Sequence, residues 1–255
     1  MVRLSVNINK VATLRNSRHE QTHGTTGRPS VCRATAHCID AGAKGITVHP
    51  RPDARHITLA DAREIAELLA PMRGEVEYNI EGDPRPELID LVLELRPDQF
   101  TLVPVRVGEL TSQAGWPSDT PREALAKLVE RVQANGTRVS IFVDPEEAPI
   151  RWAASLGAKR VELFTEPYAR AWNVGPQQAR ESFQHYVRAA TLAHELGLGV
   201  NAGHDLDEHN LELFAALPYL DEVSIGHAIL AEALFDGLSR VVKRYLALLS
   251  PLTRR

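Results

Sequence analysis

The chain has few cysteines, no surplus of basic residues and no long apolar run. Its 255 residues include two cysteines and carry a formal net charge of −4, with a pI of about 6.2. Nucleic acids and anionic membranes attract clustered basic residues, so we expect neither as a partner. No segment approaches the ~18 apolar residues of a membrane span. The start, MVRLSVNINK, has no secretory apolar core, and we expect a cytoplasmic protein.

The scarcity of cysteine excludes a disulfide framework. Cys32 and Cys38 are six residues apart on an expected helix, so they face different ways and cannot easily form a bridge. We expect both to be small core or surface residues in a reducing compartment.

Short β-rich runs alternate with helical patterns along the chain. Amphipathic patterns predict helices at 59–70, 121–136, 181–197 and 227–249. Strands are predicted at 3–9, 45–49, 75–80, 99–103, 138–144, 160–165, 199–203 and 222–226. This alternation predicts an α/β fold, a (β/α)₈ TIM barrel with residues 1–255 as one domain. A doubly wound sheet is the alternative, but the turn after the first strand, VNINKVATLRN, has no glycine fingerprint.

Polar side chains gather where the predicted strands end. In a TIM barrel, the residues that do chemistry come from the carboxyl ends of the strands and the loops after them. Glu77 and Glu162 are expected on the third and sixth strands, and Glu77 shares one face of its strand with Glu75 and Asn79. The other strand exits carry Asn7, Asn9, Lys10, His49, Arg51, His204, Gly226 and His227. The sequence therefore predicts a shared site at one rim, with the long loops 10–29, 104–120 and 165–177 as candidate lids or binding loops.

The last two strand exits suggest phosphate binding. Gly226 and His227 directly precede an apolar helix, whose first N–H groups would face the rim. Arg18, Arg51 and Thr111 could hold a second phosphate, the arginines through bidentate contacts.

Three histidines and one glutamate are candidates for proton transfer. His49, His204 and His227 have an unperturbed pKa near ~6.5, which suits acid–base work at neutral pH. Glu77 is expected in the middle of its strand, where burial would raise its pKa and make it a candidate base.

Two other chemistries receive less support. A Schiff-base aldolase needs a lysine inside the barrel, and Lys10 alone is predicted at the right end. A metal site could form from His49, Glu77 and His204, but no HxH or HExxH spacing is present. A metal-dependent phosphosugar isomerase or aldolase, and a silent barrel that only binds phosphorylated metabolites, stay open as alternatives.

Four segments resemble the pyridoxine 5′-phosphate synthase family: VNINKVATLRNSR, AGAKGITVHPRPDARHI, VNAGHDL and IGHAI. The resemblance runs from Val6 to the final helix. It implies a (β/α)₈ barrel with extra helices, assembled as an octamer that is built from four dimers. It also implies a transferase that condenses 1-deoxy-D-xylulose 5-phosphate with 3-amino-2-oxopropyl phosphate. The products are pyridoxine 5′-phosphate, phosphate and water, and no metal or organic cofactor is needed.

The resemblance also implies roles for individual residues. His49 and Glu77 match the family's two bases, His204 its acid, and Glu162 a carboxylate that steadies a charged intermediate. Asn7, Arg18, Gly226 and His227 match positions that hold the aminoketone phosphate. Arg51, His56 and Thr111 match positions that hold the pentulose phosphate.

Three residues of the expected substrate-binding set depart from the commonest family pattern. Asn9 and Lys10 stand where an Asp-His pair is usual, and Asp205 stands where glycine often follows the acid. A cation at position 10 would strengthen anion binding.

Overall fold

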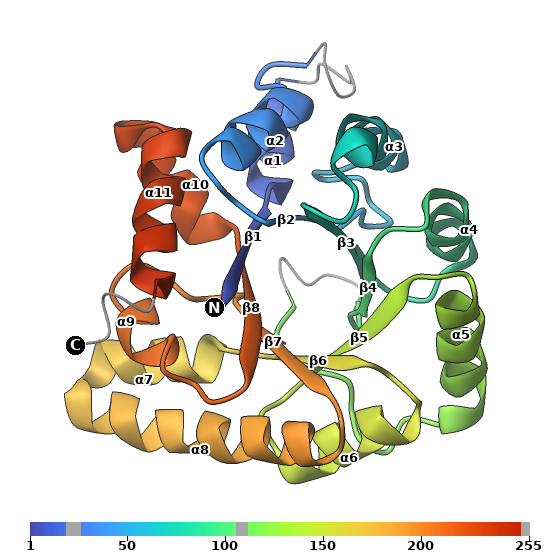
Figure 1. Cartoon of the computed structure of the whole chain (residues 1–255), viewed down its shortest axis with the longest axis vertical. Helices are drawn as coiled ribbons and strands as arrows, with labels where there is room; N and C mark the ends of the chain where they lie inside the picture. The colour runs from blue at the N-terminus through green and yellow to red at the C-terminus, as the bar shows by residue number, and fades with distance from the viewer. Residues whose placement is uncertain (19–26, 106–111, 251–255) are drawn as a thin grey trace.

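The computed structural model describes residues 1–18, 27–105 and 112–250. Eight parallel strands pair in sequence order, and β8 pairs with β1 to close a barrel. Figure 1 shows the strands at the centre with a ring of helices outside them. The strands are β1 (Arg3–Asn7), β2 (Gly45–Val48), β3 (Glu77–Gly82), β4 (Gln99–Leu102), β5 (Arg138–Val143), β6 (Arg160–Leu163), β7 (Gly199–Ala202) and β8 (Leu220–Ile225).

The outer ring contains one or more helices after each strand. They are α1 (Asn9–Asn16), α2 (Val31–Asp40), α3 (Leu59–Leu69) followed by the 3₁₀ turn η1 (Ala70–Met72), α4 (Pro86–Leu95), α5 (Arg122–Ala134), α6 (Glu147–Ser155), α7 (Glu166–Val174), α8 (Pro176–Glu195), α9 (Leu211–Phe214), α10 (His227–Asp236) and α11 (Leu238–Leu249). Within the described residues, no helix is both long and apolar enough to span a bilayer.

Alternation along each strand separates an apolar layer from a polar one. In β5, Val139, Ile141 and Val143 are fully buried in the hydrophobic core. The residues between them belong to the other face, which points to the barrel axis. There polar side chains bond to one another, as Ser5 does with Thr47 at 2.7 Å and Thr101 with Asn79 at 3.0 Å. The interior thus differs from the usual packing of bulky aliphatic side chains.

The barrel predicted from the sequence is confirmed, with three local differences. β3 begins two residues later than the predicted 75–80. The helix predicted at 227–249 is divided at Gly237, whose φ of +83° ends α10 before α11 begins. Two segments expected to be long loops contain α1 and α7, and residues 106–111 of the third lie outside the described residues. Cys32 and Cys38 are free and buried.

A buried ion pair joins α1 to α3 behind the rim. Arg15 donates from Nη1 and Nη2 to the two carboxylate oxygens of Asp61, at 2.5 and 2.8 Å, and both side chains are fully buried. Asp61 also accepts from the backbone N–H of Thr58 and completes a capping box at the start of α3. Next to Arg15, Asn16 donates to the carbonyl of His56 at 2.9 Å. The pair therefore supports the loop after β2.

We expect Asp61→Asn to lower the free energy of unfolding by about 3–5 kcal/mol, because it leaves the buried Arg15 charge uncompensated. The matched control is Glu94→Gln, which breaks a bidentate pair with Arg63 that is about half exposed, and it should cost at most about 1 kcal/mol. Denaturant titration of both variants measures the difference, and equal losses would contradict this view of the buried pair.

Candidate active site

The rim at the carboxyl ends of the strands contains a polar cavity of about 290 Å³. Every sequence-predicted site residue except Glu77, Arg18 and Thr111 lines it. The lining residues are Asn7, Asn9, Lys10, His49, Arg51, His56, Glu81, Val103, Ser112, Phe142, Glu162, His204, Asp205, Ser224, Gly226 and His227.

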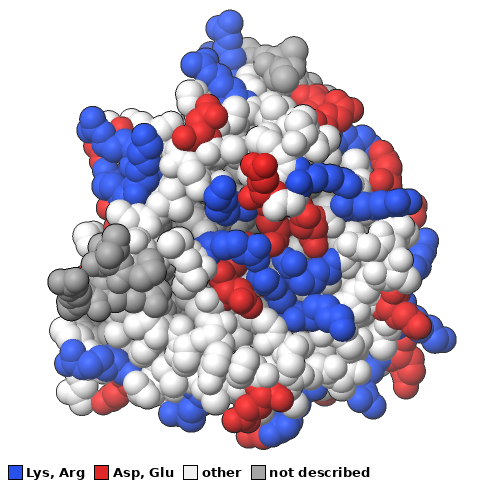
Figure 2. Space-filling model, in the orientation of Figure 1, with Lys and Arg blue, Asp and Glu red and all other residues white. Residues whose placement is uncertain are grey.

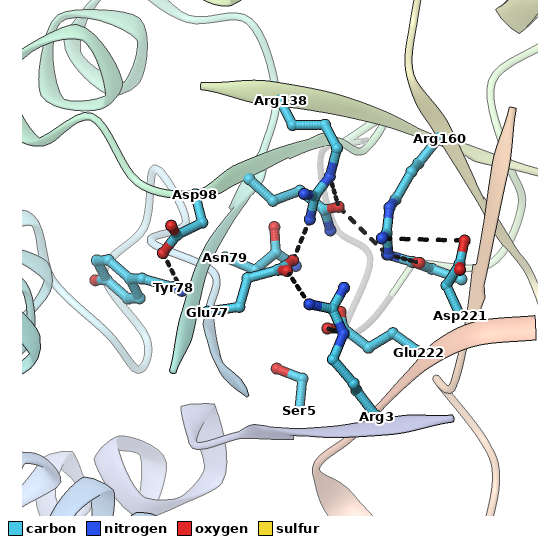
Figure 3. Close-up of polar contacts among 12 residues, drawn as sticks. Arg3, Ser5, Glu77, Tyr78, Asn79, Asp98, Arg138, Arg160, Asp221 and Glu222 are labelled. Atoms are coloured by element: carbon cyan, nitrogen blue, oxygen red, sulfur yellow. Dashed lines mark hydrogen bonds and ion pairs between the residues drawn. The ribbon is translucent and has the colours of Figure 1, made fainter. Parts of the chain in front are cut away.

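The prediction for Glu77 is wrong in its position. Glu77 is the first residue of β3, so it lies at the opposite end of the barrel. Figure 3 shows its carboxylate between two guanidinium groups: Arg3 lies 2.9 Å away, and Arg138 also donates to it. It lines a separate hollow of about 530 Å³ with Lys44 and Asp98. Figure 2 shows charged side chains of both signs gathered at the centre of this face.

Glu81 occupies the position that was predicted for Glu77. It is two full alternations further along β3, so it shares Glu77's face but lies at the carboxyl end of the strand. The sequence contained this signal, because Glu77, Asn79 and Glu81 recur with a period of two. The glycine after Glu81 instead favoured an earlier end for the strand.

Two other predicted residues are not brought into the cavity. Arg18 is exposed just beyond the end of α1 and is not among the lining residues. Thr111 lies outside the described residues. Its neighbour Ser112 is buried and does line the cavity.

Backbone and side-chain contacts hold His49 at the exit of β2. Asn9 accepts from the His49 backbone N–H at 2.9 Å, and Asn7 in turn accepts from the Asn9 N–H at 3.1 Å. The exit of β1 therefore fixes the exit of β2. Burial lowers the pKa of His49 well below 6.5, and the charges of His56 and Arg51 lower it further. His49 is therefore a neutral imidazole at neutral pH.

Two buried carboxyl groups face the same cavity. Burial raises the pKa of Glu81 to about 7, and burial together with the neighbouring Glu81 charge raises that of Glu162 well above 4.5. Asn7 donates to Glu81 at 3.4 Å, and His49 Nδ1 lies 3.7 Å from the same carboxyl oxygen. With the His49 pKa lowered and the Glu81 pKa raised, this contact is not a formal ion pair. Burial thus favours the protonated form of Glu162, and Glu81 can exchange its proton near neutral pH.

His204 has the opposite protonation preference to His49. Its Nδ1 lies 2.7 Å from the Asp205 carboxylate. Burial acts to lower its pKa, but the bond to Asp205 and the charges of Asp205 and Glu81 outweigh this and raise it. The pKa values of His49 and His204 are thus shifted in opposite directions, the arrangement that separates a base from an acid.

Cationic and backbone donors surround the acid–base groups. Lys10, Arg51 and His56 line one part of the cavity. Elsewhere on its wall, α10 begins immediately after Gly226, so its first N–H groups lie at the rim. A Cβ on Gly226 would come within 2.8 Å of the Asn7 carbonyl oxygen, so only glycine permits this close approach of β8 to β1. These donors suit phosphate groups.

Besides Glu81, the sequence analysis missed four lining residues: Val103, Ser112, Phe142 and Ser224. Phe142 and Ser224 follow the same alternation as their strand neighbours Ser140 and Gly226, so strand periodicity could have placed them. No signal marked Ser112. Among the described residues, no group of three or more His, Cys, Asp or Glu side chains has an arrangement suited to a metal ion.

Comparisons with known structures support the barrel. 3-Hexulose-6-phosphate synthase from Salmonella typhimurium superposes with a TM-score of 0.61 at 12% identity, over 98% of this chain and 100% of that one. Phosphoribosyl anthranilate isomerase from Thermotoga maritima superposes with a TM-score of 0.60 at 14% identity, covering 98% of each chain. At such identities the likeness concerns the fold alone.

Sequence comparison is more specific. Pyridoxine 5′-phosphate synthase of Christiangramia forsetii is 48% identical over 250 residues, covering 98% of this chain and all of that one. The protein of that name from Leptospira biflexa serovar Patoc is 46% identical over 260 residues and 98% of each chain. The family model described as pyridoxal phosphate biosynthesis protein PdxJ matches residues 4–251. Both the model match and these identities show that the chain belongs to the PdxJ family.

Proposed function

We propose that this chain is a pyridoxine 5′-phosphate synthase, a transferase that condenses 1-deoxy-D-xylulose 5-phosphate with 3-amino-2-oxopropyl phosphate. The observation that carries the proposal is the cavity in which His49 and His204 have pKa values shifted in opposite directions beside Glu81. Membership of the PdxJ family supports the substrates. The phosphate donors around the cavity support two phosphorylated ligands.

The reaction proceeds by proton transfers and eliminations. The amine of one substrate attacks the ketone of the other, and loss of water gives an imine. Removal of a proton next to the imine carbon gives an enamine, and inorganic phosphate is expelled. Carbon–carbon closure and loss of a second water complete the aromatic ring. These steps need only groups that accept or donate protons, so a site with two bases and one acid can catalyse them.

The described residues divide these tasks by protonation state. His49 is neutral and Glu81 titrates near neutral pH, so both act as bases. The contact with Asp205 favours the protonated form of His204, which acts as the acid. Burial favours the protonated form of Glu162, which donates a hydrogen bond to an oxygen of the intermediate.

Phosphate binding fixes both carbon chains. Arg51, His56 and Lys10 hold the pentulose phosphate, while Asn7, Gly226 and His227 hold the aminoketone phosphate at the start of α10. Fixing both substrates makes ring closure effectively intramolecular, for which effective molarities reach ~10⁵–10⁸ M.

The homo-octamer and the cytoplasmic location stay predictions. The exposed apolar side chains Leu234 and Phe235, at the end of α10, support association between copies of the chain.

Purified protein incubated with both substrates should produce the ultraviolet band of a pyridinol and release one inorganic phosphate per product. Each substrate alone should give neither signal, and the activity should survive a chelator. Ligand binding without product would leave a metabolite-binding barrel, and activity abolished by the chelator would indicate a metal-dependent enzyme.

Glu81→Gln should lower kcat by about 10²–10⁴-fold, because it removes a base that lines the cavity. Glu77→Gln is the matched control. It makes the same change on the same face of β3 but at the far end, and should leave kcat within about threefold. Steady-state kinetics on folded protein separates them. A larger loss in Glu77→Gln would return the second base to position 77.

The rate should rise with pH through about 7, because Glu81 must lose its proton to act as a base and burial raises its pKa to about 7. In Glu81→Gln, the residual activity should lose this acidic limb. A pH profile of kcat/KM between pH 5 and 9 tests the assignment, and an unchanged acidic limb in the variant would assign it to another group.

A further inference from the structure

We propose that Asp205 is a positioning residue that orients the His204 imidazole and keeps it protonated for the acid step. The inference rests on the proposed function and assigns Asp205 a role different from the substrate contact expected from the sequence. Asp205 Oδ2 lies 2.7 Å from His204 Nδ1, within hydrogen-bond range.

The backbone around the pair is held at several points. The Asp205 N–H donates to the Thr165 hydroxyl at 3.4 Å, and the Asn210 amide donates to the Asp205 carbonyl at 3.2 Å. Before the pair, Gly203 has a φ of +150°, and a Cβ there would lie 2.1 Å from the Ser224 carbonyl oxygen. The turn after β7 is thus fixed by its packing against β8. This packing holds the Asp205 carboxylate in one position relative to the His204 ring.

Aromatic rings hold the imidazole plane. The His204 ring lies 6.4 Å from that of Phe142 and 6.1 Å from that of Phe164, at interplanar angles of 63° and 58°. With Nδ1 engaged by Asp205, proton transfer to a ligand falls to Nε2. A carboxylate at Nδ1 fixes the tautomer in this way in many acid–base sites.

The charges that face His204 come from three other elements besides its own loop. The charge of Asp205, on the same loop, and the charge of Glu81, on β3, favour the protonated ring. The charge of Lys10, on α1, opposes it. His49, after β2, feels the His204 charge in turn. Asp205 contacts the Nδ1 atom of the His204 ring directly.

The pairing also explains how a carboxylate is tolerated in a cavity suited to phosphate. An isolated anion beside Lys10 and Arg51 would compete with the substrates for these cations and would repel their phosphate groups. The contact with the His204 imidazolium compensates the charge of the Asp205 carboxylate.

The first measurement follows the His204 imidazole in the resting protein by nitrogen-detected NMR, with His204→Gln to assign its signals. In Asp205→Asn, the His204 titration should move to lower pH, because the amide supplies no charge. Asp207→Asn is the matched control. It removes a charge two residues away but keeps an oxygen that can accept from the backbone N–H groups of His209 and Asn210, and its His204 titration should match the wild type.

The second measurement is the pH profile of kcat/KM. In Asp205→Asn, the ratio of kcat/KM at pH 6.5 to that at pH 8.5 should rise by about fivefold or more, because the acid loses its proton earlier. Asp205→Glu should recover part of the alkaline activity. Asp205→Gly serves as the second variant if the asparagine protein does not fold.

An unchanged His204 titration in Asp205→Asn or Asp205→Gly would overturn the proposal, as would an equal loss of kcat/KM at every pH. A protein that makes no pyridinol but whose His204 titration still depends on Asp205 would refute the proposed function and leave the positioning of His204 by Asp205 supported.

Discussion

The alternation of apolar and polar residues along the strands is the constraint on which the rest of the structure depends. One face of each strand packs against the helices, where residues such as Ile46, Ile80 and Phe100 are completely buried. The other face carries polar side chains to the barrel axis, where no helix can cover them. Buried polar groups must bond to one another, and they do so through pairs such as Ser5 with Thr47. The polar side chains of the barrel interior already form hydrogen bonds with one another. The same alternation therefore continues to the rim, where it places polar side chains around the cavity.

At the rim, burial and neighbouring charges differ from one polar residue to the next, and these differences shift the pKa values of the residues in different directions. His49 and His204 are the same residue type, but burial and surrounding positive charges lower the pKa of the first, while the contact with a carboxylate raises that of the second. Burial raises the pKa of Glu81 to about 7. No residue is unusual by itself. The environment that the closed barrel imposes on each residue separates their roles.

The sequence predicted the barrel and most of the rim because both depend on local pattern. Strand runs, helix stops and the polar residues at strand exits can be read within short windows. Glu77 was misplaced because the identity of a strand's end depends on pairing with β2 and β4, which a single strand does not reveal. The glycine and proline after Glu81 suggested an earlier end. The prediction that Arg18 lies at the site was wrong for a related reason, because its distance from the cavity depends on where α1 ends. The contact between Asp205 and His204 depends on a turn geometry that no spacing encodes.

The position of Glu77 at the far end of the barrel affects other carboxyl groups along the barrel axis. Burial raises the pKa of Glu222 to about 7, and the nearby charge of Glu77 adds to this rise. Burial also raises the pKa of Glu162, and the charges of Glu81 and Glu222 add to it. Glu81, Glu162 and Glu222 therefore interact along the barrel axis, and their proton losses belong to the set rather than to one residue. The charged groups of the far mouth thus reach the rim through these intermediate carboxyl groups.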